Sequence, residues 1–117
     1  MYSIGIDLGG TNIAGAVLDS QGNIVFKKSI PTRRERHWEA IVNDIGILVK
    51  SLVKDYGIRM GAVQSVGVGC PGIIDPHSGR VVFASNLAFE DVPIQAYLQE
   101  MLPCPIHIEN DANAAAY

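Results

Sequence analysis

The sequence predicts an α/β domain built on a mixed five-stranded sheet, in which a meander of three antiparallel strands is followed by two parallel strands. Three observations support this prediction. Apolar and polar residues alternate near the N-terminus, with turn signals between the alternating segments. A long stretch with helical periodicity follows, and after it come two short apolar segments separated by a second helical stretch. Short turns are typical of antiparallel neighbours, whereas a helix between two strands is typical of a parallel crossover.

The composition is that of one globular domain. The chain has 117 residues, of which 48% are hydrophobic and 18% charged, and this balance excludes a disordered or collagen-like protein. The formal net charge of −3 gives no general attraction to nucleic acid, so we expect no such partner. No apolar run is long enough for a membrane span, and the N-terminus lacks the basic region of a signal peptide. A chain with only two cysteines fits a reducing compartment better than a disulfide framework, so we expect the cytoplasm. The two cysteines lack C-x-x-C spacing and therefore give no support for structural zinc.

The first part of the chain predicts the antiparallel meander. Apolar and polar residues alternate in residues 2–8, which is the period of a half-buried strand. Gly9 and Gly10 then predict a tight turn, because glycine reaches positive φ without steric cost. Residues 13–18 and 24–30 predict the second and third strands, joined by a second turn of polar residues.

The next segment has the period of an amphipathic helix. One helical face collects Trp38, Ile41, Ile45, Leu48, Val49, Leu52 and Tyr56. Gly57 stands where a C-terminal cap belongs. Thr32 and Glu35 have the spacing of a capping box, with a residue closer to the helix as the alternative N-cap.

Two further strands are predicted at residues 66–70 and 106–108, where β-favouring apolar residues are bounded by Gly and Pro. Between them, the apolar residues 73–74 and 81–83 flank a turn of Asp, Pro, His, Ser and Gly. This arrangement predicts a small hairpin or flap outside the main sheet.

The second helix is predicted to begin at Asp91 and Pro93, and its buried face contains Ile94, Tyr97, Leu98 and Met101. Asn110 and Asp111 predict the cap of another helix that starts at Ala112. Little more than one turn of that helix lies within the chain, so we expect the chain to be part of a longer fold.

The residues after the first strand have the chemistry of a phosphate-binding turn. Asp7 lies near the end of the strand, and Gly9, Gly10 and Thr11 form the turn. Glycine amides can approach phosphate oxygens because no Cβ stands in the way, and the Thr11 hydroxyl adds a donor. The Asp7 carboxylate suits a hydrated Mg²⁺, which prefers one or two carboxylates with water and phosphate. The spacing excludes the P-loop and the Rossmann fingerprint, and an ordinary tight hairpin is the alternative.

Small residues also end the strand at 66–70. Gly69, Cys70, Pro71 and Gly72 leave room beyond its carboxyl end, where ligands bind in open α/β sheets. The alternative is a turn that only ends the strand. We expect Cys70 to pack as a small buried hydrophobic residue rather than to act as a nucleophile.

Polar side chains gather where the last strand ends. Asp111 follows Glu109 and Asn110, and it is either a helix N-cap or a carboxylate that accepts a proton from a hydroxyl group. Asn86 is a further candidate ligand for a polyhydroxylated substrate, with a turn asparagine as the alternative. His107, Glu109 and Asp111 alternate as metal ligands sometimes do, although alternating polar residues are common at strand ends.

A basic cluster surrounds the predicted end of the third strand. It contains five of the nine basic residues, namely Lys27, Lys28, Arg33, Arg34 and Arg36. We interpret this cluster as a solvated surface, with contact to phosphate or to a partner as the alternative.

Taken in order along the chain, these motifs resemble those of the ROK family of repressors, open reading frames and sugar kinases. The resemblance is to the N-terminal lobe of a glucokinase-type member, and it extends across all 117 positions. The matching segments are GIDLGGT at 5–11, GVGCPG at 67–72, NL at 86–87, VPI at 92–94 and ENDANAA at 109–115. A single D-x-G-G-T is a weak signal, whereas the ordered set is specific.

The resemblance implies an actin/hexokinase-like ATPase fold, related to ribonuclease H, in which two similar lobes enclose a cleft. Residues 1–117 are then the N-terminal lobe, and the C-terminal lobe is absent from this chain. The resemblance also implies that Asp7 helps to hold Mg²⁺ through water. Gly9, Gly10 and Thr11 are then expected to contact the phosphates of ATP.

For the sugar, the resemblance implies that Gly72 lines the binding loop and that Asn86, Asn110 and Asp111 contact the hydroxyl groups. Asp111 is also the expected general base in phosphorylation of a hexose at its 6-hydroxyl. Glucose is the first expected substrate, with N-acetylhexosamines, fructose and allose as alternatives.

The family also contains sugar-responsive transcriptional regulators, so a regulator or a sugar-binding module without kinase activity is the alternative function. Asp111 and the absence of DNA-binding helices ahead of the first strand favour the kinase. The family's zinc motif belongs to the missing lobe. We expect half of a cleft to be inactive alone, and to form a homodimer through apolar surface that a second lobe would cover.

Overall fold

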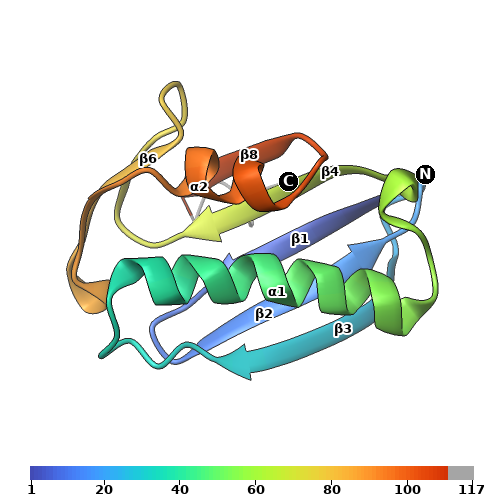
Figure 1. The fold of residues 1–117 in the computed structure, drawn as a ribbon, viewed down its shortest axis with the longest axis horizontal. Coiled ribbons are helices and arrows are strands. Elements are labelled where there is room, and N and C mark those ends of the chain that lie inside the picture. Colours follow the sequence, from blue (N-terminus) through green and yellow to red (C-terminus); the bar gives the residue numbers. More distant parts are fainter. Residues whose placement is uncertain (111–117) are drawn as a thin grey trace.

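The structure is a computed structural model that describes residues 1–110 of the chain, and its centre is a five-stranded sheet with the order β3-β2-β1-β4-β8 (Figure 1). The strands are β1 (Tyr2–Leu8), β2 (Asn12–Leu18), β3 (Ile24–Pro31), β4 (Val63–Cys70) and β8 (Ile106–Asn110). β1 and β2 are antiparallel, as are β2 and β3, whereas β4 runs parallel to both β1 and β8. The predicted mixed sheet is therefore confirmed.

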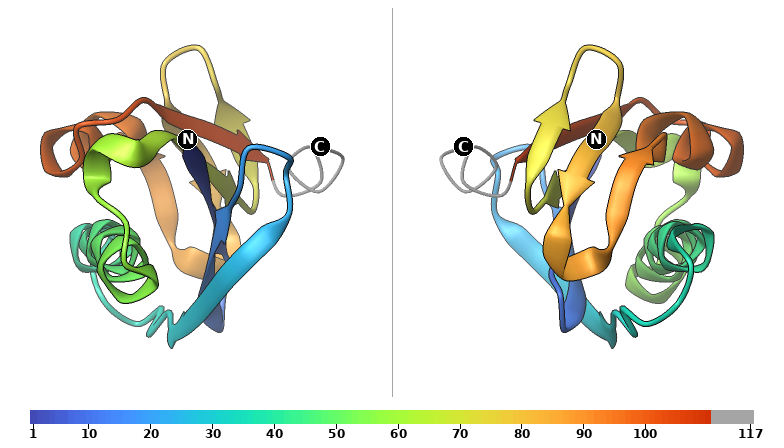
Figure 2. Two further views of the ribbon diagram at one scale, coloured as in Figure 1. Left: turned by 90° about the vertical axis from the view of Figure 1, so that its right-hand side faces the viewer. Right: turned by 90° about the vertical axis from the view of Figure 1, so that its left-hand side faces the viewer.

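Two helices, α1 (Trp38–Tyr56) and α2 (Ile94–Met101), cover the same face of this sheet (Figure 2). Their lengths agree with the helical periods in the sequence, and Gly57 caps α1 in the left-handed conformation. Short 3₁₀ turns, η1 (Met60–Ala62) and η2 (Ser85–Leu87), complete the helical elements of residues 1–110. None of these helices is long and apolar enough to cross a membrane.

The hydrophobic core lies between the sheet and the two helices. Alternate residues of the strands point toward α1 and α2, and the apolar stripe of α1 packs against them. At Gly15 the approach is so close that an added Cβ would lie 2.7 Å from Leu52 Cδ1 and 3.2 Å from Leu48 Cδ2. This glycine therefore sets how near α1 comes to the sheet.

The opposite face of the sheet carries the strand residues that alternate with the core-facing ones. It presents Gly5, Asp7, Ala14, Ala16, Lys27, Ser29, Gly67, Gly69, His107 and Glu109. Among residues 1–110, no helix lies against this face. The sheet is thus covered by described elements on one side only.

A second, three-stranded antiparallel sheet replaces the simple hairpin predicted around residues 73–83. It consists of β5 (Ile73–Asp75), β6 (Arg80–Ala84) and β7 (Phe89–Val92), in that order. The sequence did not predict β7, because its four residues lack an alternating pattern: Phe89 and Val92 are buried and the two between them are exposed.

The expected helix start at Asp91 was wrong. Asp91 belongs to β7, has a φ of 52°, and accepts a hydrogen bond of 2.6 Å from Arg80 Nε. The Arg80 guanidinium holds the pKa of the Asp91 carboxyl below its usual value. The helix begins after Pro93 without a side-chain cap, so the carboxylate serves the small sheet and not the helix.

Thr32 does not cap α1 either. The N-cap is His37, whose Nδ1 accepts a hydrogen bond of 3.3 Å from the Glu39 amide. The chain turns at Arg33, which has a φ of 55°, and a residue on the far side of this turn cannot reach the helix amides. The alternative cap closer to the helix is therefore the correct one.

Thr32 instead braces the turn between β1 and β2. Its hydroxyl, in a residue with 0% exposure, donates a 2.7 Å hydrogen bond to the Gly9 carbonyl, and its amide donates to the Thr11 carbonyl at 2.9 Å. The Thr32 carbonyl accepts a 2.9 Å bond from Arg36, which also pairs with Asp44 of α1 at 2.7 Å. The glycine turn is thus tied to the helix through a chain of hydrogen bonds.

We expect Gly15→Ala to lower the free energy of unfolding by about 1–3 kcal/mol, because the added methyl group must displace core side chains of α1. Gly67→Ala is the matched control on the open face, where no described atom lies within 4 Å of an added Cβ. This control should change the free energy of unfolding by less than about 1 kcal/mol. Urea denaturation measures both, and equal losses would contradict the one-sided packing.

We also expect Thr32→Val to lower the free energy of unfolding by about 1–3 kcal/mol, because it leaves the Gly9 carbonyl without its buried donor. Amide hydrogen exchange at Gly9 should accelerate, since this amide closes the turn through the Asn12 carbonyl. Thr32→Ser keeps the hydroxyl group and is the control. Unchanged exchange at Gly9 in the valine variant would show that Thr32 does not brace the turn.

Candidate active site

The carboxyl ends of three parallel strands meet at one edge of the sheet. In the register, Asp7 of β1 lies beside Gly69 of β4, and Gly69 lies beside Glu109 of β8. Cys70 pairs in the same way with Asn110. The three segments that the sequence singled out for their chemistry are therefore neighbours in space, at the edge where open α/β sheets bind ligands.

The glycine turn after β1 requires its glycines. The Gly9 amide donates to the Asn12 carbonyl at 3.0 Å, and a Cβ on Gly9 would lie 2.9 Å from that same oxygen. A Cβ on Gly10 would lie 3.2 Å from Asn86 Nδ2, so η2 brings Asn86 directly against the turn. Thr11 is exposed beside them. A side chain at residue 9 would therefore collide with the backbone of the turn, and one at residue 10 would crowd Asn86.

Gly72 and Asn110 form the second cluster. Gly72 has a φ of 90°, and a Cβ there would collide with the carbonyl oxygen of Phe83. Asn110 Nδ2 donates a hydrogen bond of 2.7 Å to the Gly72 carbonyl. The side chain of Asn110 thus holds the loop after β4 in position, a role that its sequence context did not reveal.

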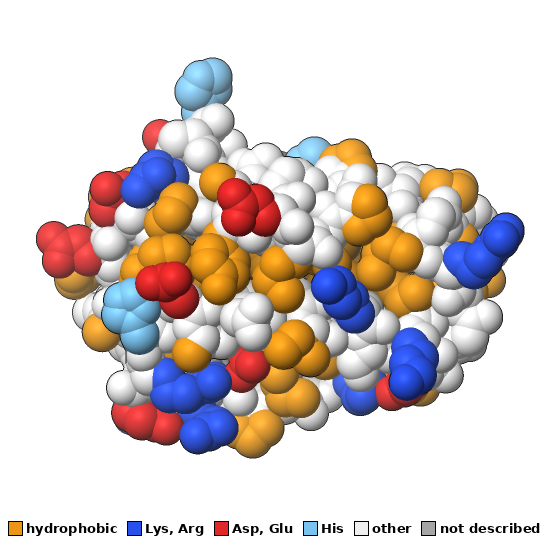
Figure 3. All heavy atoms as spheres, viewed as in Figure 1, with side chains coloured by type: hydrophobic (Ala, Val, Ile, Leu, Met, Phe, Trp, Pro, Cys, Tyr) orange, Lys and Arg blue, Asp and Glu red, His pale blue; other side chains and the backbone are white. Residues whose placement is uncertain are grey.

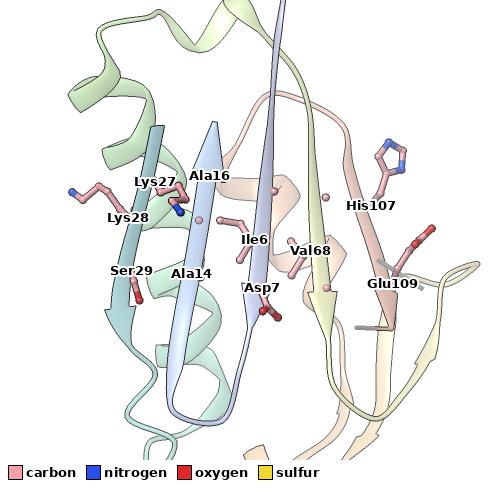
Figure 4. A pocket seen from close by; sticks show the side chains of 14 residues that line it. Ile6, Asp7, Ala14, Ala16, Lys27, Lys28, Ser29, Val68, His107 and Glu109 are labelled. Carbon is pink, nitrogen blue, oxygen red and sulfur yellow. The ribbon is translucent and has the colours of Figure 1, made fainter. Parts of the chain in front are cut away.

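Asp7 lies on the open face of the sheet, at one end of a hollow of about 1110 Å³ (Figure 4). The hollow crosses all five strands, and small residues line its centre. Lys27 lies toward one edge, whereas His107 and Glu109 lie on β8 at the other. Asp7 is exposed, so its carboxylate remains accessible to a cation.

The donor set near Asp7 fits Mg²⁺ better than a metal bound wholly by protein. Glu109 stands two strands away, which corresponds to about 10 Å between the backbones. Within residues 1–110, no group of three His, Cys, Asp or Glu side chains could hold a metal ion. One accessible carboxylate suits an ion that keeps most of its water, as Mg²⁺ does. The alternative ligand set of His107, Glu109 and Asp111 stays a prediction, because Asp111 lies outside the described residues.

A smaller hollow of about 480 Å³ lies near the glycine turn, where Asn86 and Arg34 approach Gly10. It is lined by Arg34 and Glu35, from the loop before α1, and by the segment 85–88 around η2. Two of the predicted site residues therefore line different hollows, Asp7 the large one and Asn86 the small one. Gly10 lies beside Asn86.

Asp111, the expected general base, lies outside the described residues, as does the helix predicted from Ala112. Cys70 is fully buried, which confirms its expected role as a small core residue. Cys104 is buried too, and burial raises the pKa of its thiol. Neither thiol is therefore exposed as a nucleophile.

Two residues beside the glycine turn were given other first interpretations from the sequence: Thr32 as a helix cap, and Arg34 as part of a solvated basic cluster with phosphate contact as the alternative. The β2–β3 register explains the position of Thr32, because one residue beyond the pair Asn12 and Pro31 it lies opposite Thr11. The sequence could not single out Arg34 among three neighbouring arginines, whose side chains meet different partners in the structure.

Comparison with known proteins agrees with this architecture. The glucokinase of Streptomyces coelicolor is 36% identical over 116 residues, which are 98% of this chain and 34% of that protein. A putative xylose repressor of a Caldicellulosiruptor species is 30% identical over 113 residues, which are 97% of this chain and 28% of that protein. The chain therefore spans about a third of the length of the relatives that it matches.

Among solved structures, the crystal structure of a ROK family glucokinase from Streptomyces griseus in complex with glucose and AMPPNP superimposes with a TM-score of 0.88. It is 33% identical, and the match covers 100% of this chain and 35% of that one. This likeness confirms the predicted actin/hexokinase-like fold for the part of it that the chain contains. The family model described as the ROK family matches residues 3–117, and the chain therefore belongs to the ROK family.

Proposed function

We propose that residues 1–117 form the N-terminal lobe of an ATP-dependent hexokinase, which phosphorylates the 6-hydroxyl of glucose or a related hexose. The observation that carries this proposal is that Asp7 and the glycine turn, which Asn86 approaches at Gly10, lie at the same edge of the sheet as Asn110. The Streptomyces griseus relative, which has the same fold here, binds glucose and the ATP analogue AMPPNP.

On the nucleotide side, Gly9, Gly10 and Thr11 would contact the phosphates of ATP. The lack of a Cβ at residues 9 and 10 supports this role, because the backbone approaches a phosphate only where side chains do not intervene. Asp7 would hold Mg²⁺ through water, and the ion would neutralise charge on the phosphates. The brace through Thr32 keeps the turn in place while these charges are bound.

On the sugar side, Asn86 and Asn110 would contact hydroxyl groups, and Gly72 would line the sugar loop. The hydrogen bond from Asn110 to the Gly72 carbonyl links two of these groups and fixes Asn110 at the loop that would contact the sugar. Asp111 follows directly in the sequence and would accept the proton of the attacking 6-hydroxyl as general base.

The second lobe of the cleft would come from polypeptide beyond residues 1–117, together with any zinc motif of the family. The share of the relatives' length that the chain covers, about a third, supports this division. Phosphoryl transfer depends on positioning ATP and sugar from both sides, so one lobe lacks half of the required contacts.

A sugar-responsive regulator is the second candidate function. The observation in its favour is the 30% identity to a putative xylose repressor over nearly the whole chain. A regulator needs the sugar contacts but not the general base, so the importance of Asp111 for turnover separates the two functions.

We expect the gene product that contains this chain to transfer phosphate from ATP to glucose, and Asp111→Asn to lower kcat by about 10²–10⁴-fold while the fold is kept. A coupled ADP assay over glucose, N-acetylhexosamines, fructose, allose and xylose measures this. Asp19→Asn, in the turn before β3, is the matched control and should keep the rate. Sugar binding without turnover in the wild type would instead support the regulator.

For the purified 117-residue chain, we expect no sugar-dependent ATP turnover and association into a homodimer. Apolar residues that a second lobe would cover promote this association; Ile73 and Phe83 are 62% and 50% exposed. Light scattering at high protein concentration measures the mass, and the coupled assay measures turnover. A monomer would contradict the dimer, and robust turnover would contradict the dependence on a second lobe.

A further inference from the structure

Basic side chains gather on one part of the surface in Figure 3. The sequence presents the three arginines between β3 and α1 as one cluster, but their surroundings differ. Arg36 is held by the Asp44 carboxylate at 2.7 Å and by the Thr32 carbonyl at 2.9 Å. Arg33 faces Glu35 at 3.9 Å between Nε and Oε1, with both side chains largely exposed. Within residues 1–110, Arg34 has neither a hydrogen-bonding partner nor an ion pair.

Arg34 extends instead to the glycine turn. Its Nη1 atom lies 3.8 Å from the position that a Cβ on Gly10 would occupy, and Asn86 Nδ2 lies 3.2 Å from the same position. Two nitrogen donors from different elements, the loop before α1 and η2, thus meet above one glycine. Arg34 and Asn86 also line the same hollow of about 480 Å³.

The chemistry of this point suits an anion that only accepts hydrogen bonds. A guanidinium carries five N–H donors and no acceptor, and it binds phosphate oxygens in a bidentate manner. Glu35, which lines the same hollow, directs its carboxylate to Arg33, so the charge of Arg34 is not neutralised by its neighbour. Arg34 therefore offers an uncompensated positive charge between the proposed phosphate-binding turn and the proposed sugar ligand Asn86.

We propose that Arg34 binds the phosphoryl group that is transferred from ATP to the sugar. This inference rests on the proposed kinase function. In that reaction the sugar oxygen forms a bond to the terminal phosphorus, the bond from phosphorus to the bridging oxygen breaks, and its electron pair leaves with ADP. The hydroxyl proton goes to Asp111. Arg34 forms no covalent bond; it donates hydrogen bonds to the non-bridging oxygens, whose charge it stabilises.

The loop around Arg34 is prepared for this role. Thr32, two positions before Arg34, is hydrogen-bonded to the glycine turn. Arg36, two positions after Arg34, is paired with Asp44 of α1. The backbone of Arg34 is therefore held at both sides, relative to Gly10, before any ligand binds. A preorganised donor loses less freedom on binding than one carried by an unbraced loop.

The first measurement compares Arg34→Ala with Arg33→Ala in the gene product that contains this chain. Both variants remove one exposed arginine, but only Arg34 reaches Gly10. We expect Arg34→Ala to lower kcat/KM for ATP by about 10- to 100-fold, and millimolar guanidinium ion to restore part of the rate. Arg33→Ala should stay within about twofold of the wild type, as for an exposed ion pair. Urea denaturation confirms that both variants remain folded.

The second measurement titrates inorganic tripolyphosphate onto the ¹⁵N-labelled 117-residue chain and follows the amide signals of Gly9 and Gly10. We expect the wild type and Arg33→Ala to show the same saturating shifts, and Arg34→Ala to bind at least about fivefold more weakly.

The two measurements separate the failure of this proposal from the failure of the proposed function. If the wild type phosphorylates sugar, the kinetics decide, and an Arg34→Ala variant as active as Arg33→Ala overturns the proposal. If the wild type phosphorylates no sugar, the kinase function fails and the titration decides. Tripolyphosphate binding that does not depend on Arg34 then overturns the assignment of a phosphate contact to this residue.

Discussion

The parallel pairing of β1, β4 and β8 is the constraint on which the candidate active site depends. Because the three strands run in the same direction, their carboxyl ends reach the same edge, and the segments that follow Leu8 and Cys70 leave the sheet beside Asn110 at the end of β8. An antiparallel partner in place of β4 would send these segments to opposite ends of the sheet. The helix α1 between β3 and β4 makes the parallel return possible, and its packing at Gly15 sets the distance between layers.

The buried hydroxyl of Thr32 is a second constraint on the site, because it fixes the glycine turn. It connects the glycine turn to the loop before α1, and Arg36 connects that loop to the helix. A turn rich in glycine is intrinsically free to move, so its geometry depends on these neighbours rather than on its own residues. The same connections hold Arg34 beside Gly10 and Asn86. The glycine turn, the loop that carries Arg34 and the start of α1 are therefore coupled through hydrogen bonds that involve no ligand.

The two faces of the sheet differ in the way expected for one lobe of a two-lobed protein. One face is covered by α1 and α2, whereas the other exposes small residues and the Asp7 carboxylate around a hollow of about 1110 Å³. Its relatives in the ROK family, among them a glucokinase and a putative xylose repressor, are about three times as long as this chain. A kinase and a regulator can share these elements, because one fold supports different functions.

The sequence by itself determined the mixed sheet, both helices and the three segments at its edge, because the period of apolar residues changes from two to 3.6 wherever a strand gives way to a helix. It did not determine β7 or the true N-cap His37, since four residues without alternation and a His at a helix start carry no strong local signal. Only the tertiary structure decided that Thr32 braces the turn, that Asp91 pairs with Arg80, and that Arg34 alone of its cluster reaches Gly10. These outcomes depend on contacts between residues far apart in the chain, and no local pattern encodes which of several similar side chains will meet a given partner.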